Sequence, residues 1–228
     1  AAEPSGGSSL GAAATRLPIR VRFPNGAEIG AGGATSPVLR VTDPRRFFGR
    51  IGRDGLIGFG EAWHTDLSYL PAPPAFTCLW SNEIPPKGGD TMWSNQAAAY
   101  AALDEETKAE IAPLYGVHTA GGPYAAGGYY AQVQDQLSMT ILPSDEALKE
   151  QRHPLVVTHP ETGEKLLFVN QTYTRRIEGY DPERSARLLR RLCLHAVEER
   201  FRYRLQWRPH MLTIWDNRAT QHFAINDY

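Results

Sequence analysis

Residues 63–66 read Trp63-His64-Thr65-Asp66, and this stretch decides how the rest of the sequence is interpreted. His64 and Asp66 are two positions apart, so on an extended strand both side chains project to the same face. An imidazole and a carboxylate can then supply two ligands to one metal ion, and a third ligand would complete the 2-His-1-carboxylate set typical of non-haem Fe(II). Alone the pattern is a weak signal, because a surface histidine beside a capping aspartate has the same spacing.

Further motifs follow in a fixed order along the chain. They are Gly88-Gly89-Asp90-Thr91, His159-Pro160-Glu161-Thr162-Gly163, Phe168-Val169-Asn170, Trp215-Asp216-Asn217-Arg218 and Thr220-Gln221-His222. Together with residues 63–66 they resemble the TauD/TfdA (taurine/2,4-dichlorophenoxyacetate dioxygenase) family of Fe(II)- and 2-oxoglutarate-dependent oxygenases. The resemblance extends over residues 63–228.

The resemblance implies a role for each matching position. His64, Asp66 and His222 correspond to the three metal ligands, and Thr91 corresponds to the residue whose hydroxyl contacts the far carboxylate of 2-oxoglutarate. The residue types suit these roles, since imidazole and carboxylate bind Fe(II) and a hydroxyl donates to a carboxylate. Trp215 is expected to pack beside the iron site, and an ordinary core tryptophan is the equal alternative.

The same resemblance implies the fold and the reaction. The fold class is mainly β with peripheral helices, arranged as a double-stranded β-helix (jelly roll). The expected cofactors are Fe(II), 2-oxoglutarate as cosubstrate and O2, and the expected products are a hydroxylated small organic acid, succinate and CO2. Family substrates include sulfonates and sulfate esters, so an anionic substrate is expected. The alternative function is a metal-binding, non-catalytic (pseudoenzyme) domain.

Both ends of the sequence depart from the family pattern. Residues 223–228 contain no basic residue, although the family places a 2-oxoglutarate-binding arginine shortly after the distal histidine. We therefore expect the dioxygenase domain, residues 63–228, to lack its C-terminal end. Residues 17–62 instead resemble the leading region of cyclopropane-fatty-acyl-phospholipid synthase-like methyltransferases, and residues 1–16 are expected to form a flexible lead. No S-adenosylmethionine loop follows, so no methyltransferase activity is expected.

Composition excludes several classes of function. The 228 residues carry a formal net charge of −1, which does not favour nucleic acid as a partner. Two cysteines are too few for a disulfide scaffold, and no apolar stretch approaches the ~20 residues of a membrane span. The sequence predicts a cytoplasmic protein that acts on a small molecule, and it allows a homo-oligomer.

The pattern of apolar residues predicts individual elements. Strands are expected at 76–80 and 212–215, the latter as the last strand, and a hairpin at 155–169. A helix is expected to begin at Asp181-Pro182. Two shorter helices are expected to be capped by Ser94 and Asp104.

The remaining predictions concern a loop and the other histidines. Residues 115–130, rich in glycine and tyrosine, are expected to form a loop, with His118 as a candidate substrate contact. His153 and His159 each precede a proline and are expected to be exposed. His195 is expected to be partly buried.

Overall fold

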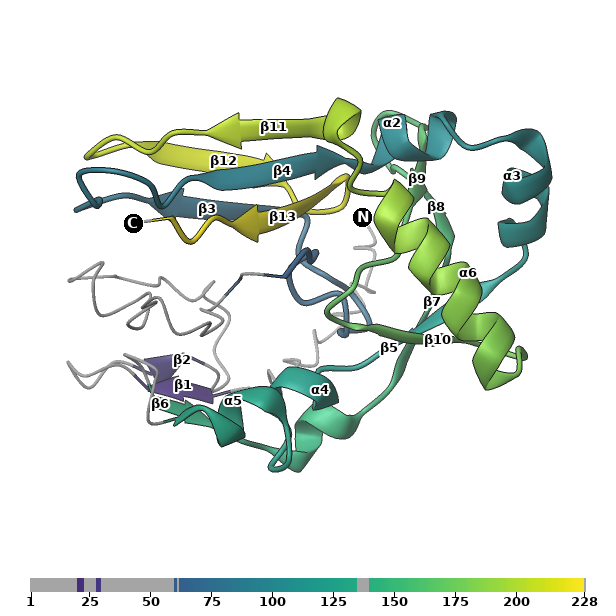
Figure 1. Ribbon diagram of the computed structural model, residues 1–228, viewed down its shortest axis with the longest axis horizontal. Coiled ribbons are helices and arrows are strands. Elements are labelled where there is room, and N and C mark those ends of the chain that lie inside the picture. Colours follow the sequence, from purple (N-terminus) through teal and green to yellow (C-terminus); the bar gives the residue numbers. More distant parts are fainter. Residues whose placement is uncertain (1–19, 23–27, 30–59, 61, 135–139, 228) are drawn as a thin grey trace, which may run out of the picture.

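The computed structural model describes residues 20–22, 28–29, 60, 62–134 and 140–227. The expected lead at 1–16 and most of the segment 17–62 lie outside these residues. Strands outnumber helices in the described part, so the mainly β prediction is confirmed (Figure 1). None of the described helices is long and apolar enough to cross a membrane.

The strands come in the following order along the chain. They are β1 (Arg20–Arg22), β2 (Glu28–Ile29), β3 (Phe76–Trp80), β4 (Thr91–Asn95), β5 (Tyr115–His118), β6 (Thr140–Leu142), β7 (Gln151–Pro154), β8 (Val156–Thr158), β9 (Lys165–Leu167), β10 (Thr174–Ile177), β11 (Arg202–Leu205), β12 (Leu212–Asp216) and β13 (Thr220–Ala224). The helices are α2 (Gln96–Ala101), α3 (Glu105–Ile111), α4 (Gly121–Tyr124), α5 (Tyr129–Gln132) and α6 (Pro182–His195), with 3-10 turns η2 (Asp145–Leu148) and η3 (Glu199–Phe201).

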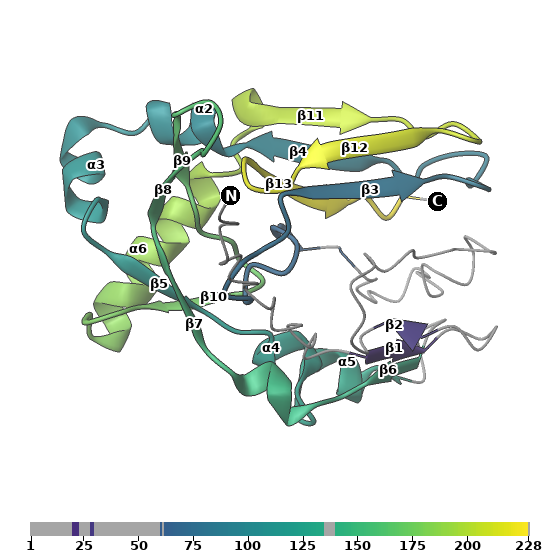
Figure 2. The same cartoon turned by 180° about the vertical axis from the view of Figure 1, so that it is seen from behind.

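Two antiparallel sheets lie next to each other and hold the site described below. One has the strand order β11-β4-β13, and the other pairs β12 with β3. Figure 1 and Figure 2, seen from opposite sides, both show them together. Trp93 of β4 and Trp215 of β12 join the sheets, with ring centroids 5.3 Å apart. On β3 and β12 half-buried residues alternate with exposed ones, which is the pattern of a strand with one solvated face.

The remaining elements form the larger core. A sheet of order β10-β5-β7 and the hairpin β8-β9 pack with α6. The apolar stripe of α6 contributes Leu188, Leu189 and Leu192 to this core, as its spacing predicts. Asp181 caps the helix by accepting from the backbone N–H of Arg184 at 2.9 Å. The third three-stranded sheet has the order β2-β1-β6.

Three local predictions need correction. Asn95, not Ser94, caps α2, because the Ser94 hydroxyl is buried and donates to the Ala196 carbonyl at 2.6 Å. The segment 115–130 is not a loop, since it contains β5, α4 and α5. β12 is not the last strand, because β13 follows and carries His222. The predicted cap at Asp104, the strand at 76–80 and the hairpin are confirmed.

The prediction of exposure is wrong for two histidines. His153 is buried and its Nε2 lies 3.0 Å from the Leu70 carbonyl oxygen. His159 is also buried, and its Nε2 lies 3.0 Å from Oδ2 of Asp216. Both hydrogen-bond partners are distant in sequence, so the proline that follows each histidine does not predict these contacts. His195 is half-buried, as predicted.

Candidate metal centre

The structure brings His64, Asp66 and His222 together. Oδ1 of Asp66 lies 3.5 Å from Nε2 of His64 and 3.6 Å from Nε2 of His222. One ligand atom from each residue lies within 4.8 Å of the others, so a single ion could contact all three. This is the only group of this kind among the described residues.

The backbone explains why the two histidines meet. His64 and His222 form an isolated antiparallel bridge, in which each backbone N–H donates to the carbonyl of the other at 3.1 and 2.8 Å. Directly opposed residues of an antiparallel pair project to the same face. Their ring centroids are accordingly 4.1 Å apart.

The tautomer of His64 suits metal binding. Its Nδ1 lies 2.7 Å from the carbonyl oxygen of Ala62, which can only accept, so Nδ1 carries the proton. In the neutral imidazole the lone pair is then on Nε2, the atom turned toward Asp66. A backbone carbonyl that orients a histidine in this way is a common feature of metal sites.

The environment of His222 keeps its imidazole neutral. Burial, and then the neighbouring His64, lower its pKa to about 3, although Asp66 acts in the opposite direction. Its Nδ1 is buried and has no hydrogen-bond partner among the described residues. Trp215 lies edge-on to the ring with centroids 5.1 Å apart, so the expected packing of this tryptophan beside the site is confirmed.

Asp66 is held as a carboxylate. Burial alone would raise its pKa, but His222, His64 and a hydrogen bond from Thr77 outweigh burial and lower it below the ordinary value. The Thr77 hydroxyl donates to Oδ2 at 2.8 Å. Asn217 binds both backbone groups of Asp66 at 2.9 Å. Two imidazoles and an anionic carboxylate are a donor set that fits Fe(II).

Thr91 lies on the same sheet as His222. Across β4 and β13, Thr91 pairs with Ala224 and Trp93 with His222, so Thr91 and His222 project to the same face. Trp207 donates from Nε1 to the Thr91 hydroxyl oxygen at 3.0 Å. The hydroxyl proton is therefore free to be donated to an anion.

His118 is a core residue and not a substrate contact. It is fully buried, with Nδ1 3.2 Å from the Ser68 hydroxyl and Nε2 3.3 Å from the Thr174 hydroxyl. Burial, and then the adjacent His153, lower its pKa to about 3. The candidate contact predicted from the sequence is thus wrong, because β5 places the side chain in the interior.

Sequence reasoning missed two residues that support the cluster. Thr77 gave no signal, since it is one position of an apolar strand. Asn217 lies inside the motif 215–218, but the motif alone does not predict that Asn217 is fully buried and binds Asp66.

Two histidines and one carboxylate around a single point, in a mainly β fold, match the donor set of mononuclear non-haem iron proteins. The family model described as "Taurine catabolism dioxygenase TauD, TfdA family" matches residues 35–228. The chain belongs to this TauD/TfdA family, as the sequence motifs indicate. The match begins at residue 35 and so includes part of the segment 17–62.

Relatives in the family are similar over most of the chain. An alkylsulfatase of Acinetobacter baylyi is 36% identical over 74% of this chain and 52% of its own length. An alpha-ketoglutarate-dependent sulfate ester dioxygenase of Pseudomonas putida is 33% identical over 84% of this chain and 63% of its own length. The chain thus spans between half and two thirds of the length of these relatives.

A solved structure shows the same similarity in three dimensions. The crystal structure of AAD-2 in complex with Mn(II) and N-oxalylglycine is 33% identical and covers 73% of this chain and 54% of that chain. The two superpose with a TM-score of 0.60.

Proposed function

We propose that this protein is an Fe(II)- and 2-oxoglutarate-dependent dioxygenase that hydroxylates a small anionic substrate of the sulfate-ester or sulfonate type. One observation carries the proposal. In a chain of the TauD/TfdA family, His64, Asp66 and His222 place three ligand atoms within 4.8 Å of one another. The residues therefore suit the metal that the family requires.

His64, Asp66 and His222 would hold the Fe(II). When bound, the metal supplies the activation of O2 that couples decarboxylation of 2-oxoglutarate, to succinate and CO2, with hydroxylation of the substrate. The chain would contribute one carboxylate and two imidazoles, and three protein ligands would leave room for the cosubstrate and O2.

Thr91 would donate its free hydroxyl proton to the far carboxylate of 2-oxoglutarate. Its position on β4, whose partner β13 carries His222, supports this role. The AAD-2 structure supports 2-oxoglutarate as the cosubstrate, because N-oxalylglycine differs from 2-oxoglutarate only by an N–H in place of a CH2 group.

The sheets would be the two halves of a jelly roll. The strand orders β11-β4-β13 and β12-β3, with the metal ligands and the Trp93–Trp215 contact between them, support this arrangement. The short bridge of His64 adds to the edge of β13.

The names of two relatives support the substrate class. The Acinetobacter relative is named an alkylsulfatase, and the Pseudomonas relative is named a sulfate ester dioxygenase.

Anaerobic titration with Fe(II) and 2-oxoglutarate tests the proposal. The expected result is a visible charge-transfer band in the wild-type protein that is absent in His64→Ala. Addition of O2 and hexyl sulfate should then release succinate. Iron binding without the band, or without succinate, would favour the non-catalytic metal-binding domain, and no iron binding would overturn the oxygenase function.

A further inference from the structure

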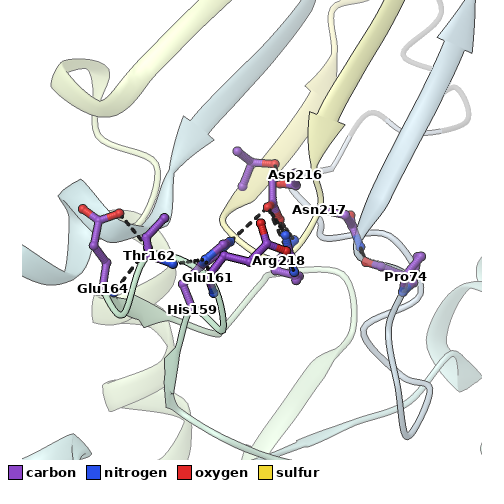
Figure 3. A network of polar contacts seen from close by, with 9 residues as sticks. Pro74, His159, Glu161, Thr162, Glu164, Asp216, Asn217 and Arg218 are labelled. Atoms are coloured by element: carbon purple, nitrogen blue, oxygen red, sulfur yellow. Dashed lines mark hydrogen bonds and ion pairs between the residues drawn. The ribbon is translucent and has the colours of Figure 1, made fainter.

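The turn that follows β8 reaches the turn between β12 and β13. His159, the first residue of the motif 159–163, is buried, and its Nε2 lies 3.0 Å from Oδ2 of Asp216. Figure 3 shows this contact at the centre of a polar network that spans the two turns. The second turn, residues 217–219, begins after Asp216 at the end of β12 and leads directly into β13, the strand of the distal histidine.

The hydrogen bonds of His159 define its tautomer. Its Nδ1 lies 3.1 and 3.3 Å from the backbone N–H groups of Thr162 and Glu161, which only donate. Nδ1 must therefore accept, and Nε2 carries the proton. The imidazole thus donates a directed hydrogen bond to the Asp216 carboxylate, which is stronger than a bond between neutral groups.

Asp216 also holds the turn between β12 and β13 in place. The Arg218 guanidinium donates to it from Nε at 2.9 Å and from Nη2 at 2.6 Å, and the Thr220 hydroxyl donates to its carbonyl at 2.7 Å. These contacts enclose Asn217, the residue between them. The second link between the turns, Arg218 to Glu161, involves an exposed carboxylate and contributes little.

Asn217 carries this order to the metal centre. Its side chain accepts from the backbone N–H of Asp66 and donates to the carbonyls of Asp66 and Pro74, at 2.9, 2.9 and 3.1 Å. Its own N–H donates to the carbonyl of Ala75 at 2.9 Å. The next residue after Asp66, Leu67, has a φ of 54°, a conformation that persists only where its surroundings fix it.

We infer that His159 is a positioning residue of the metal centre, acting through Asp216 and Asn217 on the backbone of Asp66. The inference rests on the proposed function for the identity of the centre. It gives a physical role to the motif 159–163, which the metal and cosubstrate sites leave without one. Outer contacts of this kind orient ligands, and their loss typically costs about 10- to 100-fold in metal affinity.

Two substitutions separate this role from simple packing. His159→Asn keeps an acceptor for the turn N–H groups but is too short to donate to Asp216. His159→Gln is long enough to restore that donor. His195→Gln, at a half-buried histidine of α6, is the matched control.

The measurement is a Co(II) titration of the protein, followed by the d–d absorption of the bound ion, with melting temperature recorded in parallel. We expect His159→Asn to weaken Co(II) binding by about 10-fold or more and to change the spectrum. His159→Gln should lie closer to the wild type in Co(II) affinity and in spectrum. His195→Gln should match the wild type in both quantities.

The outcomes distinguish the inference from the proposed function. If His159→Asn lowers only the melting temperature and leaves Co(II) affinity and spectrum unchanged, the positioning role is wrong while the metal centre stands. If the wild type binds no Co(II), both are wrong. Should His159→Asn not fold, a loss of Co(II) affinity as large as about 10-fold in His159→Gln, which restores the donor, would overturn the role.

A second readout does not need the metal. In the metal-free protein the backbone N–H of Asp66 is protected by its bond to Asn217. We expect its hydrogen exchange to be about 10-fold faster in His159→Asn and unchanged in His195→Gln. Equal exchange rates in all three proteins would contradict the inference.

Discussion

Thr77 donates from its hydroxyl to Oδ2 of Asp66 at 2.8 Å, while Oδ1 of the same carboxylate faces Nε2 of both metal-site histidines at 3.5 and 3.6 Å. The two carboxylate oxygens therefore have different tasks. The Thr77 hydroxyl, on β3, fixes Oδ2 and leaves Oδ1 free for an ion. Because the hydroxyl is neutral, the carboxylate keeps its full negative charge.

Thr77→Val removes this anchor with almost no change in shape. Because the carboxylate can then rotate, we expect the affinity for Co(II) to fall about 10-fold, as for other outer contacts of metal ligands. Metal titration checks the prediction. Thr213→Val, the same change at a half-buried position of the neighbouring strand β12, is the control and should bind like the wild type. Equal affinities for Thr77→Val and the control would contradict it.

Thr91→Val should weaken binding of 2-oxoglutarate and leave metal affinity unchanged. A hydrogen bond to a charged group is worth about 1.5–3 kcal/mol, so we expect at least about a 10-fold rise in the dissociation constant of 2-oxoglutarate. Anaerobic titration of the charge-transfer band measures it. Trp207→Phe, which removes the donor to the Thr91 hydroxyl but not the hydroxyl itself, should have a smaller effect. A larger effect of Trp207→Phe would show that Thr91 does not contact the cosubstrate.

Alanine substitutions at two glycines can separate the destabilising effect of a steric clash from that of backbone strain. Gly88 and Gly163 have φ values of 74° and 75°, so an alanine at either position carries the same backbone strain, about 1–2 kcal/mol. A Cβ at Gly88 would also lie 2.4 Å from the carbonyl oxygen of Asp227, whereas at Gly163 nothing lies within 4 Å. In urea unfolding, Gly88→Ala should therefore cost more stability than Gly163→Ala. Equal losses would mean that the Asp227 segment moves away freely.

The buried His118 predicts a loss of stability in acid. Its pKa is about 3 in the folded protein against 6.5 as the ordinary value. Between these values the unfolded chain binds a proton that the folded chain does not, so stability falls as the pH is lowered through this window. One such group contributes a slope of up to about 1.4 kcal/mol per pH unit.

Urea unfolding at several pH values compares His118→Gln with the wild type. We expect the slope between about pH 6.5 and pH 4 to be smaller in His118→Gln. Phe168→Leu is the control, because Phe168 stacks on His118 with centroids 5.5 Å apart but does not titrate. It should lower stability equally at every pH. An unchanged slope in His118→Gln would show that another group causes the acid sensitivity.

Local spacing predicted those parts of the structure that depend on neighbours in the sequence. His64 and Asp66 do lie at one point, although His64 forms only an isolated bridge and Asp66 lies in a turn and not on a strand. Asp181-Pro182 begins α6. The pairing of His64 with His222 joins segments distant in sequence, and the periodicity of apolar residues does not predict this pairing. Only the order of the family motifs indicated that the two histidines meet.

The incorrect predictions concern residues whose environment is set by contacts between segments distant in sequence. Local rules place His159 in a turn, yet it is buried and bonded to the Asp216 carboxylate at the end of β12. The glycines and tyrosines of residues 115–130 favoured a loop, but Gly116 lies in β5 and allows close packing there, since a Cβ would lie 3.0 Å from the Leu155 side chain. Local propensity does not contain such information.

A metal ion held by the proposed ligands His64, Asp66 and His222 would be coupled to folding. Such an ion would bind the folded chain and not the unfolded one, because these residues come from opposite ends of the segment 62–227. At a metal concentration 100 times its dissociation constant, this adds about 2.7 kcal/mol to the free energy of unfolding. Cells short of iron would then hold less of this protein as well as less active protein, since unfolded chains are degraded.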